Sequence, residues 1–286
     1  MEINRDNVIE ICRKSDIHPS KDYGQNFLIE PDACVQIVNS LDIQENERVL
    51  EIGPGIGSVT HFLSLKHNEI DVVDIDKAMV SFLNVFYKEN KNIHVIENDI
   101  RKHNISIYDK VIGNLPYNIT TEIIVYLLTS PSKFKSLVLM CQIETFAHFF
   151  DVKGSEYGPT SVLIHLLGNI EKLFAVKRGC FYPVPNVDSV VFKINIENKY
   201  PKEDVLKAYK LSKALFLNRR KTILNNLGNY LKDKNVANDY LTKLNIAPNL
   251  RPEQIAPEKY LELSKLLNVW VNINIKIKYI GNYDFS

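Results

Sequence analysis

The chain has 286 residues and a net charge of +1, with 45% hydrophobic and 24% charged residues, as in a globular protein with a substantial buried core. No apolar run reaches the roughly 18 residues of a membrane span, and the start shows neither a secretory nor a transit signal, so we expect a soluble, cytoplasmic protein. The four cysteines and seven histidines lack metal-ligand spacing, which argues against a metal site or a disulfide framework.

Two short helices with a polar segment between them are the first elements in chain order. Apolar residues at helical spacing predict the first helix over residues 7–15. Pro31 and Asp32 can open the second helix, whose apolar residues continue to Leu41. The segment between them includes residues 24–28, with the sequence GQNFL.

From residue 48 onward, short apolar strands alternate with helices. Strands are predicted over residues 48–52, 70–74, 93–96, 110–114 and 136–140, the last with an alternative end at residue 142, and helices over residues 59–65, 78–87 and 121–128. Parallel strands need crossover connections, which helices usually supply. The alternation therefore predicts an α/β fold, a Rossmann-like domain with a mostly parallel sheet.

A proline-set turn at Val184 and Pro185 leads into a further strand that reaches Ile194. We expect it to end a first domain of residues 1–197, in which residues 1–22 form an N-terminal extension. The apolar period then becomes helical, so residues 198–286 are expected to form a small α-helical domain, whose last helix begins at Pro257. From about residue 269, apolar and polar residues alternate, which predicts a strand-like tail.

The two segments of the chain differ in charge. Residues 1–192 contain 18 Lys and Arg against 25 Asp and Glu, whereas residues 193–286 contain 17 against 9. A basic segment of this kind favours a polyanionic partner such as nucleic acid, although a solvated basic surface has the same composition.

A glycine-rich turn follows the first strand of this sheet. In the sequence EIGPGIG, Gly53 and Gly55 allow the backbone to turn tightly and to approach a ligand. Asp74 ends the next strand, where its carboxylate can accept hydrogen bonds from ribose hydroxyls. These features alone would also suit a nicotinamide-dependent dehydrogenase.

Two features favour a methyltransferase over a dehydrogenase. The Gly-x-Gly-x-Gly spacing after Glu51 resembles the first motif of S-adenosylmethionine-dependent methyltransferases, whose ligand has no pyrophosphate. Asp99 ends the third strand, where it can accept from the adenine amine of that cofactor, with Ile75 and Ile100 placed on either side of the ring. A plain helix cap is the alternative role for Asp99. No hydride-transfer site is visible.

The segment 114–117, with the sequence NLPY, indicates the reaction. An exocyclic adenine nitrogen is a poor nucleophile, but the side-chain oxygen of Asn114 and the carbonyl of Leu115 can accept its two hydrogens and orient its lone pair. Pro116 fixes φ, and Tyr117 can stack on a base taken out of its helix. Transfer then depends on positioning and needs no general base. An ordinary strand-to-turn connection is the alternative.

Several ordered segments together resemble the ribosomal RNA adenine dimethyltransferases of the kasugamycin-sensitivity (KsgA) type. They are residues 24–28, 51–57, 114–120 and 181–189, with residues 217–227 and 251–255 resembling the helical C-terminal domain of that family. The resemblance covers residues 21 to about 267.

The resemblance implies roles for further residues at the cofactor site. Asn26 and Leu28 are expected to contact S-adenosylmethionine together with the residues already named, and Asn114 is expected where the cofactor meets the target amine. Asp74 stands where many relatives have Glu, which keeps the carboxylate but shortens its reach.

The resemblance also assigns residues to the RNA. Phe181 is expected on the opposite face of the flipped adenine from Tyr117, with core packing as the alternative. Arg219, Arg220 and Lys221 are expected to cluster on one helix that binds RNA, with a solvated basic face as the alternative.

The implied function is double methylation of adenine in 16S ribosomal RNA, giving N6,N6-dimethyladenosine on two adjacent adenines near the 3′ end. The implied partner is the assembling 30S particle, and the protein is expected to be a monomer without membrane contacts. One alternative is an antibiotic-resistance methyltransferase of 23S RNA, in which Ile often replaces Leu115. Another is a ribosome-assembly factor that acts mainly by binding, against which the intact Asn114 and Asp99 argue.

Overall fold

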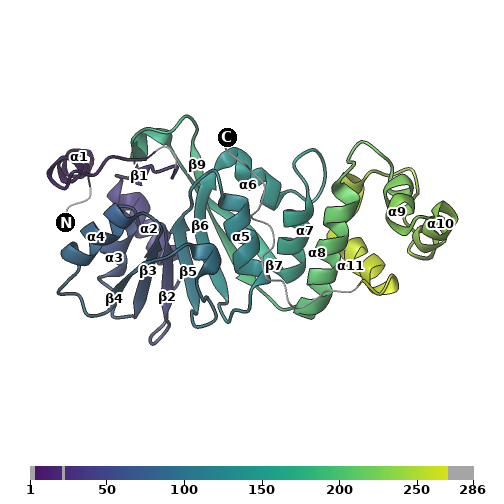
Figure 1. Ribbon diagram of the computed structural model, residues 1–286, viewed down its shortest axis with the longest axis horizontal. Coiled ribbons are helices and arrows are strands. Elements are labelled where there is room, and N and C mark those ends of the chain that lie inside the picture. Colours follow the sequence, from purple (N-terminus) through teal and green to yellow (C-terminus); the bar gives the residue numbers. More distant parts are fainter. Residues whose placement is uncertain (1–3, 21–22, 270–286) are drawn as a thin grey trace.

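The computed structural model describes residues 4–20 and 23–269. Figure 1 shows a sheet flanked by helices, followed along the chain by a group of helices beside α7. The strand-like tail predicted from about residue 269 lies almost wholly in residues 270–286, outside the described residues.

Within the described residues, seven strands form one sheet in the order β4-β3-β2-β5-β6-β9-β7. They are β2 (Val49–Ile52), β3 (Ile70–Asp74), β4 (Ile93–Glu97), β5 (Lys110–Asn114), β6 (Ser136–Gln142), β7 (Gly168–Val176) and β9 (Ser189–Ile196). Neighbouring strands from β4 to β6 pair in parallel, and β9 is antiparallel to both β6 and β7. The predicted α/β fold with a mostly parallel sheet is thus confirmed.

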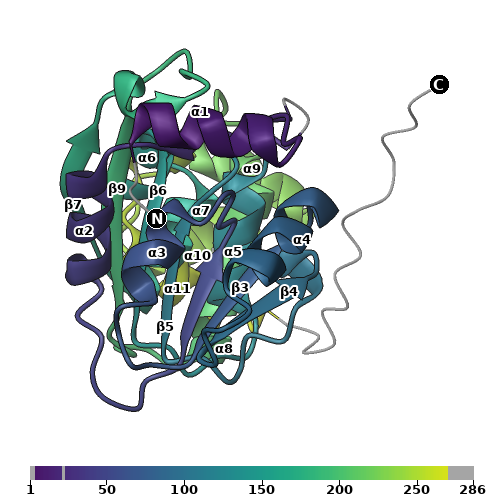
Figure 2. The same cartoon turned by 90° about the vertical axis from the view of Figure 1, so that its left-hand side faces the viewer.

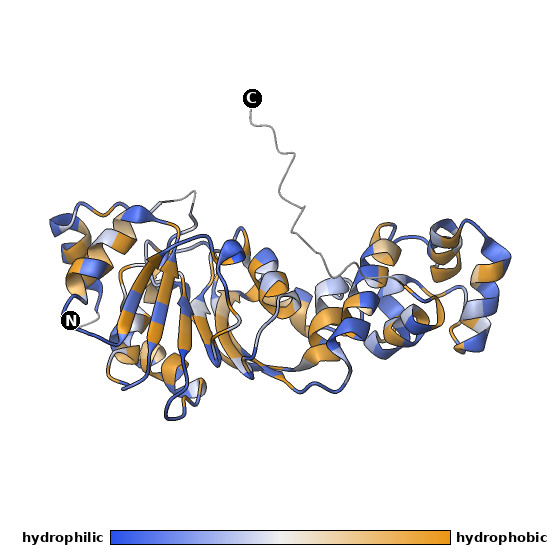
Figure 3. Cartoon of the chain, turned by 60° about the horizontal axis from the view of Figure 1, so that its bottom comes forward, coloured by the Kyte–Doolittle hydropathy of each residue, from blue (hydrophilic) through white to orange (hydrophobic). Residues whose placement is uncertain are grey.

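Helices cover both faces of the sheet, because successive strand residues point to opposite sides. Along β6, Leu137 and Leu139 belong to one hydrophobic cluster, whereas Val138 and Met140 belong to another. The first cluster includes residues of α5 (Thr120–Thr129), α6 (Ile143–Phe150) and α7 (Pro159–Leu167), and the second includes residues of α2 (Pro31–Ser40), α3 (Ser58–Leu63) and α4 (Lys77–Phe86). In Figure 3 the strands between these layers are mostly hydrophobic.

The N-terminal helix α1 (Arg5–Lys14) lies across the top of this arrangement in Figure 2. The side chain of Asn4 caps it by accepting a hydrogen bond from the Asn7 N–H at 2.9 Å. Val8 and Cys12 are buried in a third cluster that also contains Phe27. The helix therefore packs next to β1 (Phe27–Leu28), which pairs with β8 (Phe181–Tyr182) in a separate two-stranded sheet.

Three elements between residues 143 and 176 have no counterpart in the sequence prediction: α6, α7 and β7. In α7 six of the nine residues are buried, so the helix has no polar face that would reveal its period. In β7 an irregular register between Lys172 and Phe174 interrupts the alternation expected of a strand. The burial pattern of α7 and the irregular register of β7 thus explain why the sequence did not predict these two elements.

The C-terminal helices are α8 (Lys202–Phe216), α9 (Ile223–Leu231), α10 (Lys234–Lys243) and α11 (Pro257–Leu266), the last beginning at the predicted proline. Val205, Leu211 and Leu215 of α8 belong to the same hydrophobic cluster as Leu163 and Ile164 of α7. The core therefore continues across residue 197, and the division into two domains there stays a prediction. In the described part of the chain, no helix is long and apolar enough to cross a membrane.

Candidate active site

A pocket of about 280 Å³ lies at the carboxyl ends of the central strands. The chain passes from β2 outward to β3 and β4 on one side, and later to β5 and β6 on the other. Open α/β sheets bind ligands outside the strand ends at such a reversal of strand order. The volume is close to the lower end of the range for small-molecule pockets, roughly 300 to 1,000 Å³.

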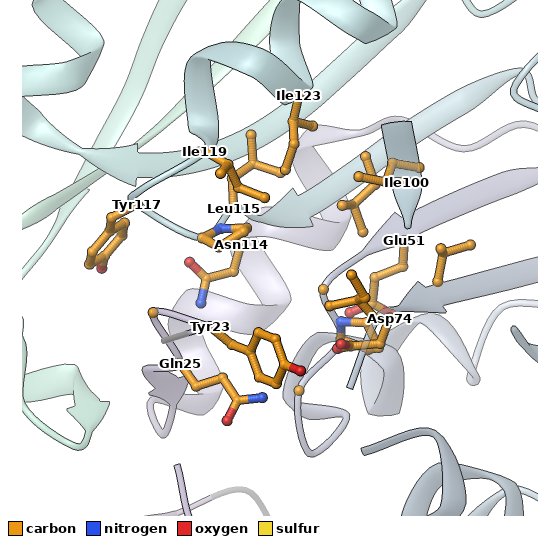
Figure 4. A pocket seen from close by; sticks show the side chains of 18 of the residues that line it. Tyr23, Gln25, Glu51, Asp74, Ile100, Asn114, Leu115, Tyr117, Ile119 and Ile123 are labelled. Atoms are coloured by element: carbon orange, nitrogen blue, oxygen red, sulfur yellow. The ribbon is translucent and has the colours of Figure 1, made fainter. Parts of the chain in front are cut away.

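This pocket brings together most of the predicted site residues (Figure 4). Its lining includes Asn26, Leu28, Gly53, Gly55, Asp74, Ile75, Asp99, Ile100, Asn114, Leu115 and Tyr117. It also includes Gln25 and Ser58, which the sequence analysis did not assign to the site. Gln25 belongs to the segment 24–28, so its place in that motif could have indicated that it lies at the site.

The glycine turn after β2 has the backbone conformation that its sequence predicts. Gly53 and Gly55 have φ values of +65° and +57°, which side-chain-bearing residues rarely adopt. A Cβ atom on Gly55 would lie 2.8 Å from the Phe27 ring. The absence of a side chain at Gly55 thus lets Phe27 of β1 pack directly against the glycine turn, which lines the pocket.

Asp74 ends β3 with its carboxylate at the pocket. Its Oδ1 accepts a hydrogen bond from the Asp76 N–H at 2.9 Å. Burial raises the pKa of Asp74 to about 6, and the nearby backbone N–H groups of Asp76, Gly55 and Ile75 oppose that rise. A ligand hydroxyl that donates to this carboxylate would stabilise its charged form.

Glu51 is a second buried carboxyl group in the pocket wall. Only 2% of its surface is exposed, and its Oε2 accepts from the Thr60 hydroxyl at 2.7 Å. Burial raises the pKa of Glu51 to about 8, with a smaller contribution from the charge of Asp74. At neutral pH this group is therefore mostly protonated and can donate as well as accept.

Asp99 follows β4 by two residues, and the structure shows the helix cap considered for it, while its contact with the cofactor stays a prediction. It caps the short helix η1 (Ile100–Lys102) by accepting from the Arg101 N–H at 3.0 Å, and it lines the pocket. Burial alone would raise the pKa of Asp99, but hydrogen bonds and charge from the Arg101 guanidinium outweigh it and lower the pKa. The ionised carboxylate has lone pairs left for a further donor.

Asn114 ends β5, and its side chain is held in one orientation. Its Nδ2 donates to the carbonyl of Asn26 at 3.1 Å, so Oδ1 is left to accept from a ligand. In Figure 4 this oxygen lies on the side toward Tyr117. Leu115 follows directly in the chain and also lines the pocket. Asn114 thus presents a fixed acceptor at this end of the pocket.

Tyr117 lies in the adjoining wall of the pocket. Its hydroxyl is 2.9 Å from Oγ of Ser189, the fully buried first residue of β9. Burial raises the pKa of Tyr117, so the phenol is neutral. The hydrogen bond fixes the phenol end of the ring.

Phe181 lies in the core and not on the pocket wall, and its predicted contact with the flipped adenine stays a prediction. Its side chain is fully buried in the cluster of α2, α3 and α4, and its backbone pairs with Leu28. It is not among the residues that line the pocket. The structure thus matches the core-packing alternative, because the ring completes an apolar cluster behind β1.

The predicted basic helix is also corrected. Arg219, Arg220 and Lys221 lie in the turn between α8 and α9, after the helix has ended at Phe216. Arg219 donates from one guanidinium nitrogen to the carbonyls of Gly154, Ser155 and Tyr157 at 2.7 to 3.3 Å, and its guanidinium lies over the Phe216 ring. Arg220 and Lys221 are exposed. Arg219 therefore joins two loops, and its two neighbours remain candidates for RNA contacts.

Replacing Arg219 by alanine is expected to lower the free energy of unfolding by about 2 kcal/mol, because charge-assisted hydrogen bonds to three carbonyls are lost. The exposed Arg220→Ala variant is the matched control and should stay within roughly 0.5 kcal/mol of the parent. Urea denaturation of both variants measures the difference. Equal destabilisation by the two substitutions would contradict the joining role of Arg219.

Comparisons with known proteins agree with the geometry of the site. A family model described as "Ribosomal RNA adenine dimethylase" matches residues 18–269. The "Ribosomal RNA small subunit methyltransferase A" of Malacoplasma penetrans (strain HF-2) is 36% identical over 258 residues, which are 89% of this chain and 94% of that protein.

Two solved structures are similar over most of the chain. A dimethyladenosine transferase from Plasmodium falciparum has a TM-score of 0.74 at 26% identity, covering 85% of this chain and 97% of its own. The 23S rRNA methyltransferase ErmE has a TM-score of 0.65 at 21% identity, covering 85% of this chain and 100% of its own. The second likeness shows a shared fold only.

Proposed function

Because the chain belongs to the ribosomal RNA adenine dimethylase family, we propose that it methylates the exocyclic amine of adenine in small-subunit ribosomal RNA. The product is N6,N6-dimethyladenosine, and S-adenosylmethionine is the methyl donor. The observation that carries the proposal is the Asn114 amide in the pocket wall, whose Nδ2 donates to the Asn26 carbonyl so that Oδ1 is left to accept from the target amine. The name of the Malacoplasma penetrans relative supports the small subunit as the target.

The pocket fits S-adenosylmethionine by the chemistry of its walls. A partly buried carboxylate, Asp74, suits the two ribose hydroxyls, and Asp99 suits the adenine amine. Ile75 and Ile100 supply apolar surface for the adenine ring, and the positive-φ turn at Gly55 leaves room for close approach. When bound, S-adenosylmethionine supplies an electrophilic methyl group on a sulfonium centre.

Asn114 and Leu115 hold the target amine. Oδ1 of Asn114 and the carbonyl of Leu115 accept its two hydrogens, which turns the nitrogen lone pair away from the ring and toward the methyl group. The nitrogen becomes acidic only as it acquires the methyl group, so the proton passes to solvent and no buried base is needed. Positioning supplies most of the rate enhancement in such a displacement.

Tyr117 provides a face on which the extruded adenine stacks. The hydrogen bond to Ser189 keeps that face in place before the base arrives. After the first transfer the amine still carries one hydrogen, so one of the two acceptors retains its partner. The same site therefore serves the second transfer.

We propose that a cytoplasmic monomer acts on the assembling 30S particle, on two adjacent adenines near the 3′ end of the RNA. The exposed Arg220 and Lys221 lie in a segment with an excess of positive charge, which supports RNA contacts there.

Transfer of labelled methyl groups tests the proposal. Purified small and large ribosomal subunits, each lacking its own adenine dimethylation, are incubated with the protein and labelled S-adenosylmethionine, and the product nucleosides are identified by mass. Dimethyladenosine in the small subunit alone is the expected result. Label in the large subunit would identify a 23S RNA methyltransferase instead, and absence of label from both would favour a binding factor.

A further inference from the structure

The segment of residues 23–28 lines one side of the cofactor pocket with all six of its residues. Its end nearest the sheet is held by β1, which pairs with β8, and by the Asn26 carbonyl, which accepts from Asn114. A second contact attaches the segment to the turn that follows β3. Nε2 of Gln25 donates to Oδ2 of Asp76 at 2.7 Å, although the two residues are 51 positions apart.

Asp76 is a central residue of the turn that follows β3. Its Oδ1 accepts from the Ala78 N–H at 2.9 Å and so caps α4, while its own N–H donates to Oδ1 of Asp74. Gln25 takes the remaining carboxylate oxygen. The Asp74 carboxylate is thus hydrogen-bonded to the backbone of Asp76, and the side chain of Asp76 is hydrogen-bonded to Gln25.

We infer that Gln25 is a positioning residue for S-adenosylmethionine: through Asp76 it fixes the pocket-lining segment and the Asp74 carboxylate relative to each other. The inference rests on the proposed function, since it takes that cofactor as the ligand. Gln25 needs no direct contact with the reacting atoms for this role. Its contribution is to the affinity and lifetime of the bound cofactor.

An exchange of donor and acceptor between the two residues tests this inference. Gln25→Glu places a carboxylate against that of Asp76, and Asp76→Asn, whose oxygen still caps α4, points an amide donor at the amide donor of Gln25. Each single variant is expected to raise the Kd for S-adenosylmethionine about tenfold. In the double variant the amide introduced at position 76 can donate to the carboxylate introduced at position 25, so the Kd should return to within about threefold of the parent.

The Kd is measured by titration calorimetry without RNA, and the dissociation rate of S-adenosylhomocysteine by stopped flow. Gln36→Glu, the same chemical change on the exposed face of α2, is the matched control and should leave both values unchanged. The melting temperature of each variant without ligand verifies that it folds.

Each outcome bears on one proposal. Recovery in the double variant supports the positioning role, because a general loss of stability would not be reversed by a second substitution. Unchanged Kd values in the single variants, or a double variant weaker than both, would overturn the role of Gln25. A parent protein that does not bind S-adenosylmethionine would contradict the proposed function itself.

Discussion

Replacing Asn114 by alanine is expected to reduce kcat for methyl transfer by roughly a thousandfold, a loss comparable to removing a transition-state hydrogen-bond partner. The side chain contributes an acceptor for the target amine at Oδ1, and its Nδ2 holds the Asn26 carbonyl. Because Asp74 and Asp99 are also proposed to bind the cofactor, its Kd should rise by no more than about tenfold. Single-turnover transfer and calorimetry measure the two quantities separately.

Asn114→Asp separates the two contributions of this side chain. The substitution keeps an oxygen that can accept from the target amine, but it removes the donor to the Asn26 carbonyl. It should therefore retain more activity than Asn114→Ala. Equal loss of transfer and of cofactor binding in the alanine variant would mean that Asn114 serves the cofactor and not the target amine.

The predicted site residues that the structure brings together in one pocket include those that end buried strands. The predicted bounds of β3 and β5 match the structure, because short apolar runs between polar turns have no other stable arrangement in an α/β pattern. Asp74 and Asn114 end these strands, so their meeting at one sheet edge follows from the parallel topology.

The placements that the sequence does not predict concern residues whose environment is set by distant parts of the chain. Phe181 is an apolar side chain in a short segment, and only the packing of β1 and β8 against the sheet shows that it faces the core. Arg219 follows a regular helix, and only the loop that contains Gly154 and Tyr157 shows why its guanidinium turns inward. Local pattern carries no information about such partners.

Gln25 illustrates the same limit within a correctly recognised motif. The sequence marks residues 24–28 as characteristic, but it does not indicate which of them bind a ligand and which bind the protein. Its partner Asp76 is on another element, two residues beyond the strand that ends in Asp74. The sequence alone therefore does not predict the contact between Gln25 and Asp76.

Cofactor affinity is expected to fall as the pH drops below about 6, and Asp74 is the expected cause. Its pKa is raised from 3.8 to about 6 by burial, so the carboxylate is ionised above that pH and protonated below it. In the proposed complex the two ribose hydroxyls donate to the ionised form, which lowers the pKa of Asp74. Binding below pH 6 must then release a proton, so the Kd should rise by up to tenfold for each further pH unit.

Asp74→Asn should raise the Kd about 100-fold at pH 7.5, since hydrogen bonds to a charged acceptor are lost, and should remove the pH dependence between pH 5 and about 7. Glu51, with a pKa of about 8, titrates above this range, so its contribution is separated from that of Asp74. Asp74→Glu is the matched control and should keep both the affinity, within about tenfold, and the pH dependence. Calorimetry in buffers of different ionisation enthalpy counts the released protons. A pH dependence that persists in Asp74→Asn would assign it to another group, and the ribose contact proposed for Asp74 would then lose its main support.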